Sequence, residues 1–158
     1  MATVWRLTPP RFAHLLDGEG SRQVGGRWNS PGKRVVYTSS HLSLCALEVY
    51  VHMPLELRAE LPEFTAVCIE IPDDATKTEI SIARLADLMT GPDPLAACQA
   101  AGDDWLAHGT DLILQAPSVL VPEDSNIMLN PTHPRSGEVS VVSSRSFQFD
   151  PRLAIERR

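Results

Sequence analysis

The sequence has few cysteines, and they are arranged in no recognisable motif. Cys45, Cys68 and Cys98 lie far apart, and no Cys-x-x-Cys pair occurs. This excludes a disulfide framework and a cysteine-based zinc site. Unclustered thiols are typical of proteins in reducing compartments, so we expect buried, reduced cysteines in a cytoplasmic protein.

Other common site motifs are missing as well. The five histidines show no His-Glu-x-x-His or other ligand spacing, so we expect no metal. The sequence lacks both Gly-x-Gly-x-x-Gly and Gly-x-x-x-x-Gly-Lys-[Ser/Thr], which argues against Rossmann and P-loop nucleotide sites. Ser118 follows a proline but is not flanked by glycines as in Gly-x-Ser-x-Gly, which argues against a nucleophile elbow.

Positive charge and long hydrophobic runs are also scarce. The formal net charge is -6, which argues against a broad electrostatic grip on nucleic acid but allows a small basic pocket for a phosphorylated ligand. The first residues contain no apolar segment typical of a signal peptide. No apolar run approaches the roughly 18 residues that span a membrane, so we expect no membrane segment.

The sequence does contain enough apolar residues for one hydrophobic core. Its 158 residues are 43% hydrophobic, which predicts a single domain over 1–158. Alternation and β-branched residues predict strands at 3–7, 34–38, 64–71 and 111–116, with one or two more within 137–149. Helical spacing predicts helices at 41–52, 81–89 and 95–108, and a helical turn at 11–16. Segments 21–33, 55–63 and 123–134 are expected to be irregular. The sum predicts an α+β domain with a mostly antiparallel or mixed sheet.

Glu48 is unusual because it lies within an apolar stripe of the predicted helix 41–52. Ser39 or Ser40 is expected to cap that helix. At 100° per residue, Glu48 shares one face with Leu44, Leu47 and Val51, which predicts a core-facing carboxylate. A buried, unpaired charge costs several kcal/mol. Glu48 is therefore either a structural partner of a nearby arginine (Arg27 or Arg34) or a catalytic carboxylate that stabilises a cationic transition state.

Two further candidates precede that helix. Arg27 follows a glycine pair, which allows close approach to a ligand, and its guanidinium can grip a phosphate; the alternative is a surface loop arginine. Tyr37 ends a buried strand and is either a core residue with a satisfied hydroxyl or a wall on which a planar ring stacks. Trp28 has the same two interpretations, with core packing favoured.

Taken together, two long blocks resemble the RES domain family, which is named for its arginine, glutamate and serine. The first block is GGRWNSPGKRVVYTSSHLSLCALEVYVH, and the second is GDDWLAHGTDLILQAPSVLVPEDSNIMLNPTHP. The opening VWRL and the closing FQFDPRL are similar too, and residues 73–94 are the least family-like part. The residues that match the family pattern are Arg27, Trp28, Asn29, Tyr37, Glu48, Ser118, Asn126, Asn130, Pro131 and His133.

The resemblance implies a fold like that of ADP-ribosyltransferases, with a mixed sheet core and flanking helices. It implies a bacterial toxin that uses NAD+ as substrate and cleaves its nicotinamide–ribose bond. Glu48 would stabilise the positive ribose, Arg27 would hold the pyrophosphate or an adjoining ribose, and Tyr37 would stack on nicotinamide or fix the ribose. Ser118 would bond the nicotinamide side or orient Glu48. Asn29 belongs to the expected NAD+ site.

The resemblance also implies a partner, and it leaves the outcome of cleavage open. The partner would be a helix-turn-helix antitoxin of the Xre type, whose C-terminal segment plugs the active site and which contacts DNA in place of the toxin. ADP-ribose would pass to a protein acceptor, or to phosphate or water in an enzyme that depletes NAD+. The alternative outside enzymes is a catalytically silent binding module with the same fold.

Overall fold

A seven-stranded sheet forms the core of the described part of the chain. The computed structural model describes residues 1–156, so the last two residues of the expected domain 1–158 lie outside it. The strand order is β4-β5-β6-β2-β1-β3-β7. The strands are β1 Ala2–Thr8, β2 Val36–Ser39, β3 Phe64–Ile71, β4 Lys77–Glu79, β5 Ile113–Pro117, β6 Ser125–Leu129 and β7 Ser140–Phe147. β4 and β5 are parallel, and the other neighbours pair antiparallel, which confirms the predicted mixed sheet and α+β class.

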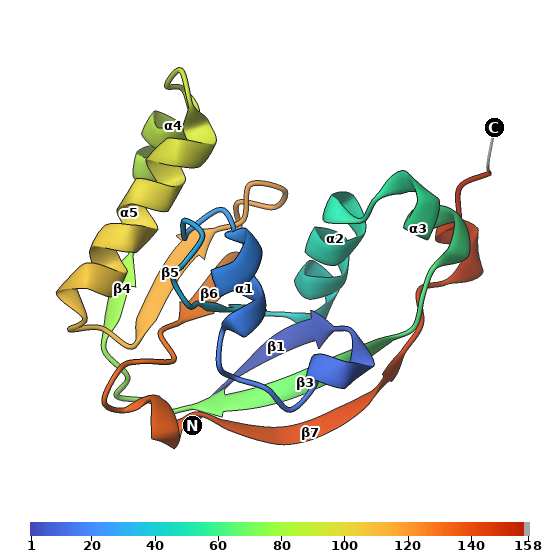
Figure 1. Cartoon of the computed structure of the whole chain (residues 1–158), viewed down its shortest axis with the longest axis horizontal. Helices are drawn as coiled ribbons and strands as arrows, with labels where there is room; N and C mark the ends of the chain where they lie inside the picture. Colours follow the sequence, from blue (N-terminus) through green and yellow to red (C-terminus); the bar gives the residue numbers. More distant parts are fainter. Residues whose placement is uncertain (157–158) are drawn as a thin grey trace.

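Within residues 1–156, five α-helices flank the sheet: two at each end and one between them (Figure 1). They are α1 Glu19–Val24, α2 Leu42–His52, α3 Leu55–Glu60, α4 Ile82–Met89 and α5 Pro94–His108. Short 3-10 turns occupy Pro10–Phe12, Ser136–Glu138 and Pro151–Leu153. Figure 1 shows α4 and α5 together at one end of the molecule, α2 and α3 at the other, and α1 between them. No helix within residues 1–156 is long and apolar enough to cross a membrane.

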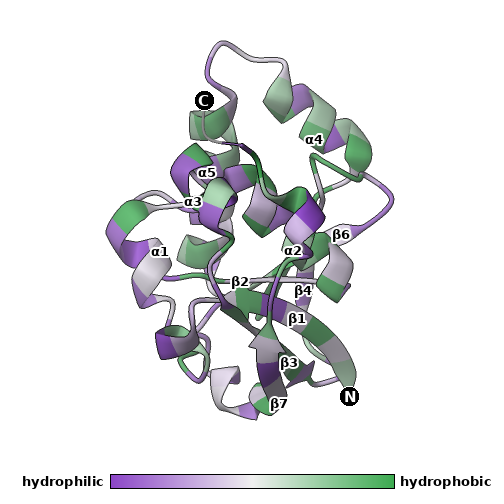
Figure 2. Cartoon of the chain, turned by 90° about the vertical axis from the view of Figure 1, so that its right-hand side faces the viewer, coloured by the Kyte–Doolittle hydropathy of each residue, from purple (hydrophilic) through white to green (hydrophobic). Residues whose placement is uncertain are grey.

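The caps of α4 and α5 follow directly from the sequence. The Ser81 hydroxyl accepts a hydrogen bond from the Arg84 amide, and the Asp93 carboxylate accepts one from Ala96. Gly109 ends α5 in the left-handed conformation at φ 64°, which a glycine adopts without steric cost. Along α4, hydrophobic and hydrophilic residues follow one another in bands, as an amphipathic helix requires (Figure 2).

Parts of three segments expected to be irregular are in fact regular. Residues 19–24 and 55–60 form α1 and α3, which are too short to show a helical period. Residues 125–129 form β6, although polar and turn-forming residues surround them. β6 is held between β2 and β5, so pairing on both edges outweighs its weak local signal. The three-residue strand β4 had not been predicted at all.

The expected cap of α2 was also wrong. His41 occupies the N-cap position, and no side chain caps the helix. The Ser39 hydroxyl is directed instead toward Asn126, and that of Ser40 toward the His41 ring. The long-range contact of Ser39 therefore replaces the local one that the sequence suggested.

Candidate active site

One cavity of about 410 Å³ opens between α1, α2 and the centre of the sheet. This volume is within the range of small-molecule sites. Its lining joins segments that are far apart in sequence. The lining residues are Leu7, Ser21, Val24, Gly25, Gly26, Arg27, Trp28, Tyr37, Thr38, Ser39, Cys45, Glu48, Val49, His52 and Asn126.

Glu48 lies at the edge of this cavity rather than in the core. The predicted core-facing stripe of α2 was only partly right: Leu44 is buried, but Leu47 and Val51 are each 39% exposed. The helix instead turns Cys45 and Val49 toward the hydrophobic residues around β1. This rotation leaves the Glu48 side chain 22% exposed, with its carboxylate on the cavity wall.

Two polar neighbours, the buried Ser118 and the partly buried Asn126, hold one oxygen of the Glu48 carboxylate. The Ser118 hydroxyl donates to Glu48 Oε1 at 2.8 Å, and the Asn126 amide donates to the same oxygen at 2.7 Å. The second oxygen lies 3.8 Å from His52 Nδ1. Within residues 1–156 Glu48 forms no ion pair with an arginine, and Arg34 pairs with Glu19 instead, so the structural-pair interpretation was wrong.

Ser118 sits behind Glu48, in the turn that follows β5. It is completely buried and does not line the cavity. Its oxygen accepts hydrogen bonds from the amides of Leu120 and Val121, at 3.0 and 3.2 Å. The only hydroxyl hydrogen is therefore left for Glu48, since a carboxylate oxygen can only accept. Of the two predicted contacts of Ser118, this geometry favours the one that orients Glu48.

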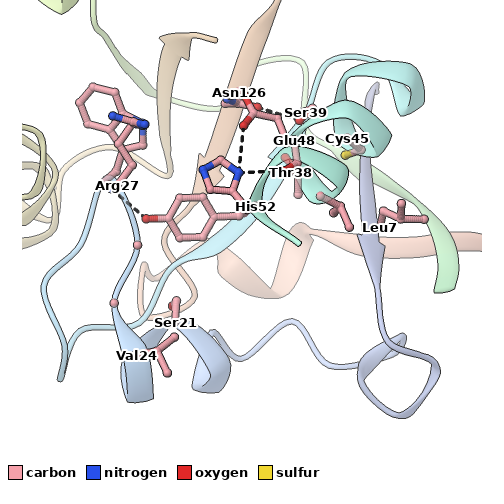
Figure 3. A pocket seen from close by; sticks show the side chains of 15 residues that line it. Leu7, Ser21, Val24, Arg27, Thr38, Ser39, Cys45, Glu48, His52 and Asn126 are labelled. Atoms are coloured by element: carbon pink, nitrogen blue, oxygen red, sulfur yellow. Dashed lines mark hydrogen bonds and ion pairs between the residues drawn. The ribbon is translucent and has the colours of Figure 1, made fainter. Parts of the chain in front are cut away.

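Arg27 lies on the opposite wall. Figure 3 shows its side chain across the cavity from Glu48 and Asn126, with His52 between them in this view. The guanidinium is half-buried, and its one hydrogen-bond contact to the described residues is Met89 Sδ at 3.4 Å. Sulfur is a weak acceptor, so nearly all the donors of Arg27 remain available to a ligand.

Tyr37 combines both interpretations that its sequence position allowed. Its hydroxyl accepts a hydrogen bond from the Trp28 amide at 2.9 Å and donates one to Asn29 Oδ1 at 2.6 Å. Burial raises the pKa of the Tyr37 phenol well above its ordinary value, so the group stays protonated. The hydroxyl is therefore engaged within the protein, while the ring lines the cavity and can contact a planar ligand.

Several other family-pattern residues do not reach the cavity. Asn29 is completely buried, and its amide donates to the carbonyls of Ser21 and Lys33, so it holds the arginine loop together. His133 is buried beside the Thr110 carbonyl. Neither is among the cavity-lining residues.

Helix α5 presses against the loop that carries Arg27. A methyl group on Gly102 would meet the Trp28 carbonyl oxygen at 1.8 Å, so only glycine allows this approach. The Asp103 carboxylate accepts hydrogen bonds from the amide and the hydroxyl of Ser30. Burial acts to raise the pKa of Asp103, but these bonds and the nearby Lys33 outweigh it and lower the pKa.

The structure adds residues to the site that the sequence did not single out. Ser39, Cys45 and His52 all line the cavity. The one signal for Ser39 was its place two residues after Tyr37, on the same face of β2. The Cys45 thiol lies 2.8 Å from the Trp5 carbonyl, and burial raises its pKa, so it stays a neutral thiol. Residues 1–156 contain no cluster of side chains suited to a metal ion.

Comparison with known proteins places this geometry in context. The sequence model of the RES domain family matches residues 3–150. The "Prs ADP-ribosylating toxin" of Sphingobium sp. is 33% identical, over 94% of each chain. A protein named "Toxin Res" from Yersinia enterocolitica is 36% identical, over 95% of this chain and 98% of its own. The toxin–antitoxin complex of M. tuberculosis MbcT and MbcA contains a similar fold, with a TM-score of 0.69 and 24% identity over 97% of this chain and 86% of that chain.

Proposed function

The chain belongs to the RES domain family, and we propose that its cavity binds NAD+ and cleaves the bond between nicotinamide and ribose. The observation that carries this proposal is the pair of hydrogen bonds from Ser118 and Asn126 to Glu48 Oε1. They fix a carboxylate at the wall of a half-enclosed cavity before any ligand arrives. A fixed anion stabilises a developing positive charge without the cost of reorganisation.

The proposed chemistry uses Glu48 on the sugar. When nicotinamide leaves with the bonding electron pair, positive charge develops on the ribose at C1. The second oxygen of Glu48, which lies 3.8 Å from His52 Nδ1, would stabilise that charge and accept a hydrogen bond from a ribose hydroxyl. Because the lining around the carboxylate includes apolar side chains such as Val49, the attraction is stronger than it would be in water.

The opposite wall is proposed to hold the rest of the dinucleotide. Arg27 has a guanidinium with almost no protein partners, and it would grip the pyrophosphate or an adjoining ribose. The Tyr37 ring would contact nicotinamide or support the twisted ribose, while its engaged hydroxyl holds the loop around Trp28 and Asn29 in place. Asn29 and Ser118 act behind the site and shape it without touching substrate.

For the fate of ADP-ribose, we propose transfer to a protein acceptor, because a relative of similar length is named as an ADP-ribosylating toxin. Release to water or phosphate, which would deplete NAD+, is the alternative outcome. We further propose a helix-turn-helix antitoxin as partner, acting in the cytoplasm, with a segment that covers the cavity. The similar fold in a toxin–antitoxin complex supports a partner of that kind.

The test is nicotinamide release from NAD+ by the purified chain, free of any antitoxin. Label from NAD+ that appears on a protein band only when lysate is present would support the transferase. Free ADP-ribose in buffer would indicate hydrolysis, and a phosphate-dependent product would indicate phosphorolysis. A folded protein that releases no nicotinamide under any of these conditions would contradict NAD+ cleavage and favour a silent binding module.

A further inference from the structure

Strand pairing places two polar side chains directly under the Glu48 carboxylate. In the antiparallel register of β2 and β6, Ser39 lies opposite Asn126. Side chains at opposed positions share one face of a sheet and approach closely. The Ser39 hydroxyl donates to Asn126 Oδ1 at 2.8 Å, and Asn126 Nδ2 donates to Glu48 Oε1 at 2.7 Å. A serine, an amide and a carboxylate therefore form one chain of hydrogen bonds.

The direction of this chain follows from what each group can donate. An amide that turned over would point its oxygen at the carboxylate, and both groups would then be acceptors. The carboxylate therefore sets the orientation of the amide, and the Ser39 hydroxyl, which can donate or accept, holds the amide there by donating to its oxygen. Ser39 is only 3% exposed, so little water is available to take its place.

The neighbouring strand position shows that this arrangement is specific to Ser39. Thr38 is also buried and also carries a hydroxyl, but that hydroxyl donates to the Ile127 backbone carbonyl across the same strand pair. A contact of that kind holds strands together and leaves side-chain orientation alone. Ser39, one residue later, directs its hydroxyl to a side chain that in turn contacts Glu48.

We propose that Ser39 and Asn126 are positioning residues that anchor Glu48 Oε1 from below, so that Oε2 alone faces the substrate. This inference rests on the proposed cleavage of NAD+. Ser118, in the turn after β5, donates to the same oxygen. The hydrogen bonds from Ser118 and Asn126 together fix the plane of the carboxylate. Neither Ser39 nor Asn126 needs to touch NAD+ for this role. Their loss should therefore reduce turnover more than substrate binding.

Kinetics of nicotinamide release provide the first test. Asn126→Ala should lower kcat by about tenfold to a hundredfold, the usual effect of losing a hydrogen bond to a charged group, with KM changed by less than about threefold. Ser39→Ala should lower kcat by a smaller factor, and Ser39→Thr, which keeps the hydroxyl, should restore most of it. Because Ser39 acts through Asn126, Ser39→Ala should have no further effect on kcat in the Asn126→Ala protein.

Thr78→Val is the matched control for these variants. The Thr78 hydroxyl also donates to a partly buried side chain, Asp111 at 2.6 Å, but at the far edge of the sheet. The control should lose stability without loss of kcat. The proposal would be overturned if Ser39→Ala lowered kcat by the same factor in the wild-type protein and in the Asn126→Ala protein. It would also be overturned if Asn126→Ala left kcat unchanged.

A second measurement does not depend on activity. In NMR spectra of the unliganded protein, the two Asn126 side-chain amide protons should exchange slowly with solvent. Ser39→Ala should speed this exchange and shift their resonances, while Thr78→Val should leave both unchanged. If Ser39→Ala leaves these signals unchanged, the proposed positioning is wrong. A wild-type protein whose Asn126 amide protons exchange slowly but which releases no nicotinamide would contradict the proposed function. It would not contradict the positioning of Glu48 by Ser39 and Asn126.

Discussion

The two walls of the cavity are built in different ways. On one wall, the Glu48 carboxylate is held by side chains from β6 and from the turn after β5. On the other, the loop of Arg27 is held through its backbone by α5 and by Tyr37, while the guanidinium itself contacts only a methionine sulfur among the described residues. The protein thus fixes the carboxylate of Glu48 itself, whereas at Arg27 it fixes the backbone of the loop and leaves the guanidinium group largely unbound.

This difference matches what each charge is proposed to do. A carboxylate that stabilises a short-lived positive charge acts best when it is already oriented, because reorganisation would then cost nothing during the reaction. An arginine that grips a flexible dinucleotide can be ordered by the ligand, and it loses little when the cavity is empty. Changes to the carboxylate wall should therefore alter the rate, and changes to the arginine wall should alter binding or stability.

The largest effect is expected from Glu48→Gln. The glutamine oxygen can still accept from Ser118 and Asn126, so the fold should remain while the negative charge disappears. We expect nicotinamide release to fall at least about a hundredfold with little change in Tm. Wild-type release by this variant would show that the carboxylate wall has no catalytic role.

Arg27→Ala should act mainly on substrate binding. Loss of a charge-assisted contact with a phosphate predicts a rise in KM of about tenfold or more. Because Arg27 has one weak contact in the protein, the free energy of unfolding should change by less than about 0.5 kcal/mol. Arg27→Lys is the control, since it keeps the charge but loses the forked geometry and should restore binding only in part. A fall in kcat at constant KM would reverse the roles given to the two walls.

Gly102→Ala should separate stability from chemistry on the arginine wall. The added methyl group would collide with the Trp28 carbonyl, and such overpacking costs about 1 to 3 kcal/mol of unfolding free energy. Gly91→Ala is the control, because nothing lies within 4 Å of its added carbon. Chemical denaturation of both variants would measure the difference. Equal stabilities would mean that α5 does not hold the loop.

The smallest effect is expected at acid pH, from Asp103→Asn. Asp103 has a pKa below its ordinary 3.8 in the folded protein, so the unfolded chain binds a proton first as pH falls. Its contribution is complete above about pH 4 and is lost as pH falls through the folded pKa. The wild type should therefore lose more stability than Asp103→Asn as the pH is lowered below about 4. Parallel stability curves would exclude this contribution.

The sequence predicted the parts of the fold that depend on residues close to one another in the chain. The caps Ser81, Asp93 and Gly109 bond residues three or four positions away, so these contacts are local in the chain. β6 escaped prediction because its structure depends on two strands that are distant in sequence. The stripe around Glu48 was wrong for the same reason, since the packing of β1, and not the helix itself, decides which side of α2 is buried.

The sequence by itself determined the α+β class, the family, and the presence of Arg27, Tyr37 and Glu48 in one block of the chain. Only the tertiary structure decided their partners. Ser118 follows Glu48 by 70 positions and Asn126 follows it by 78, and β-strand register brings both to one carboxylate oxygen. No periodicity in a chain encodes such a contact, because hydrogen-bond partners across a sheet are chosen by strand order and register, which the whole core must satisfy together.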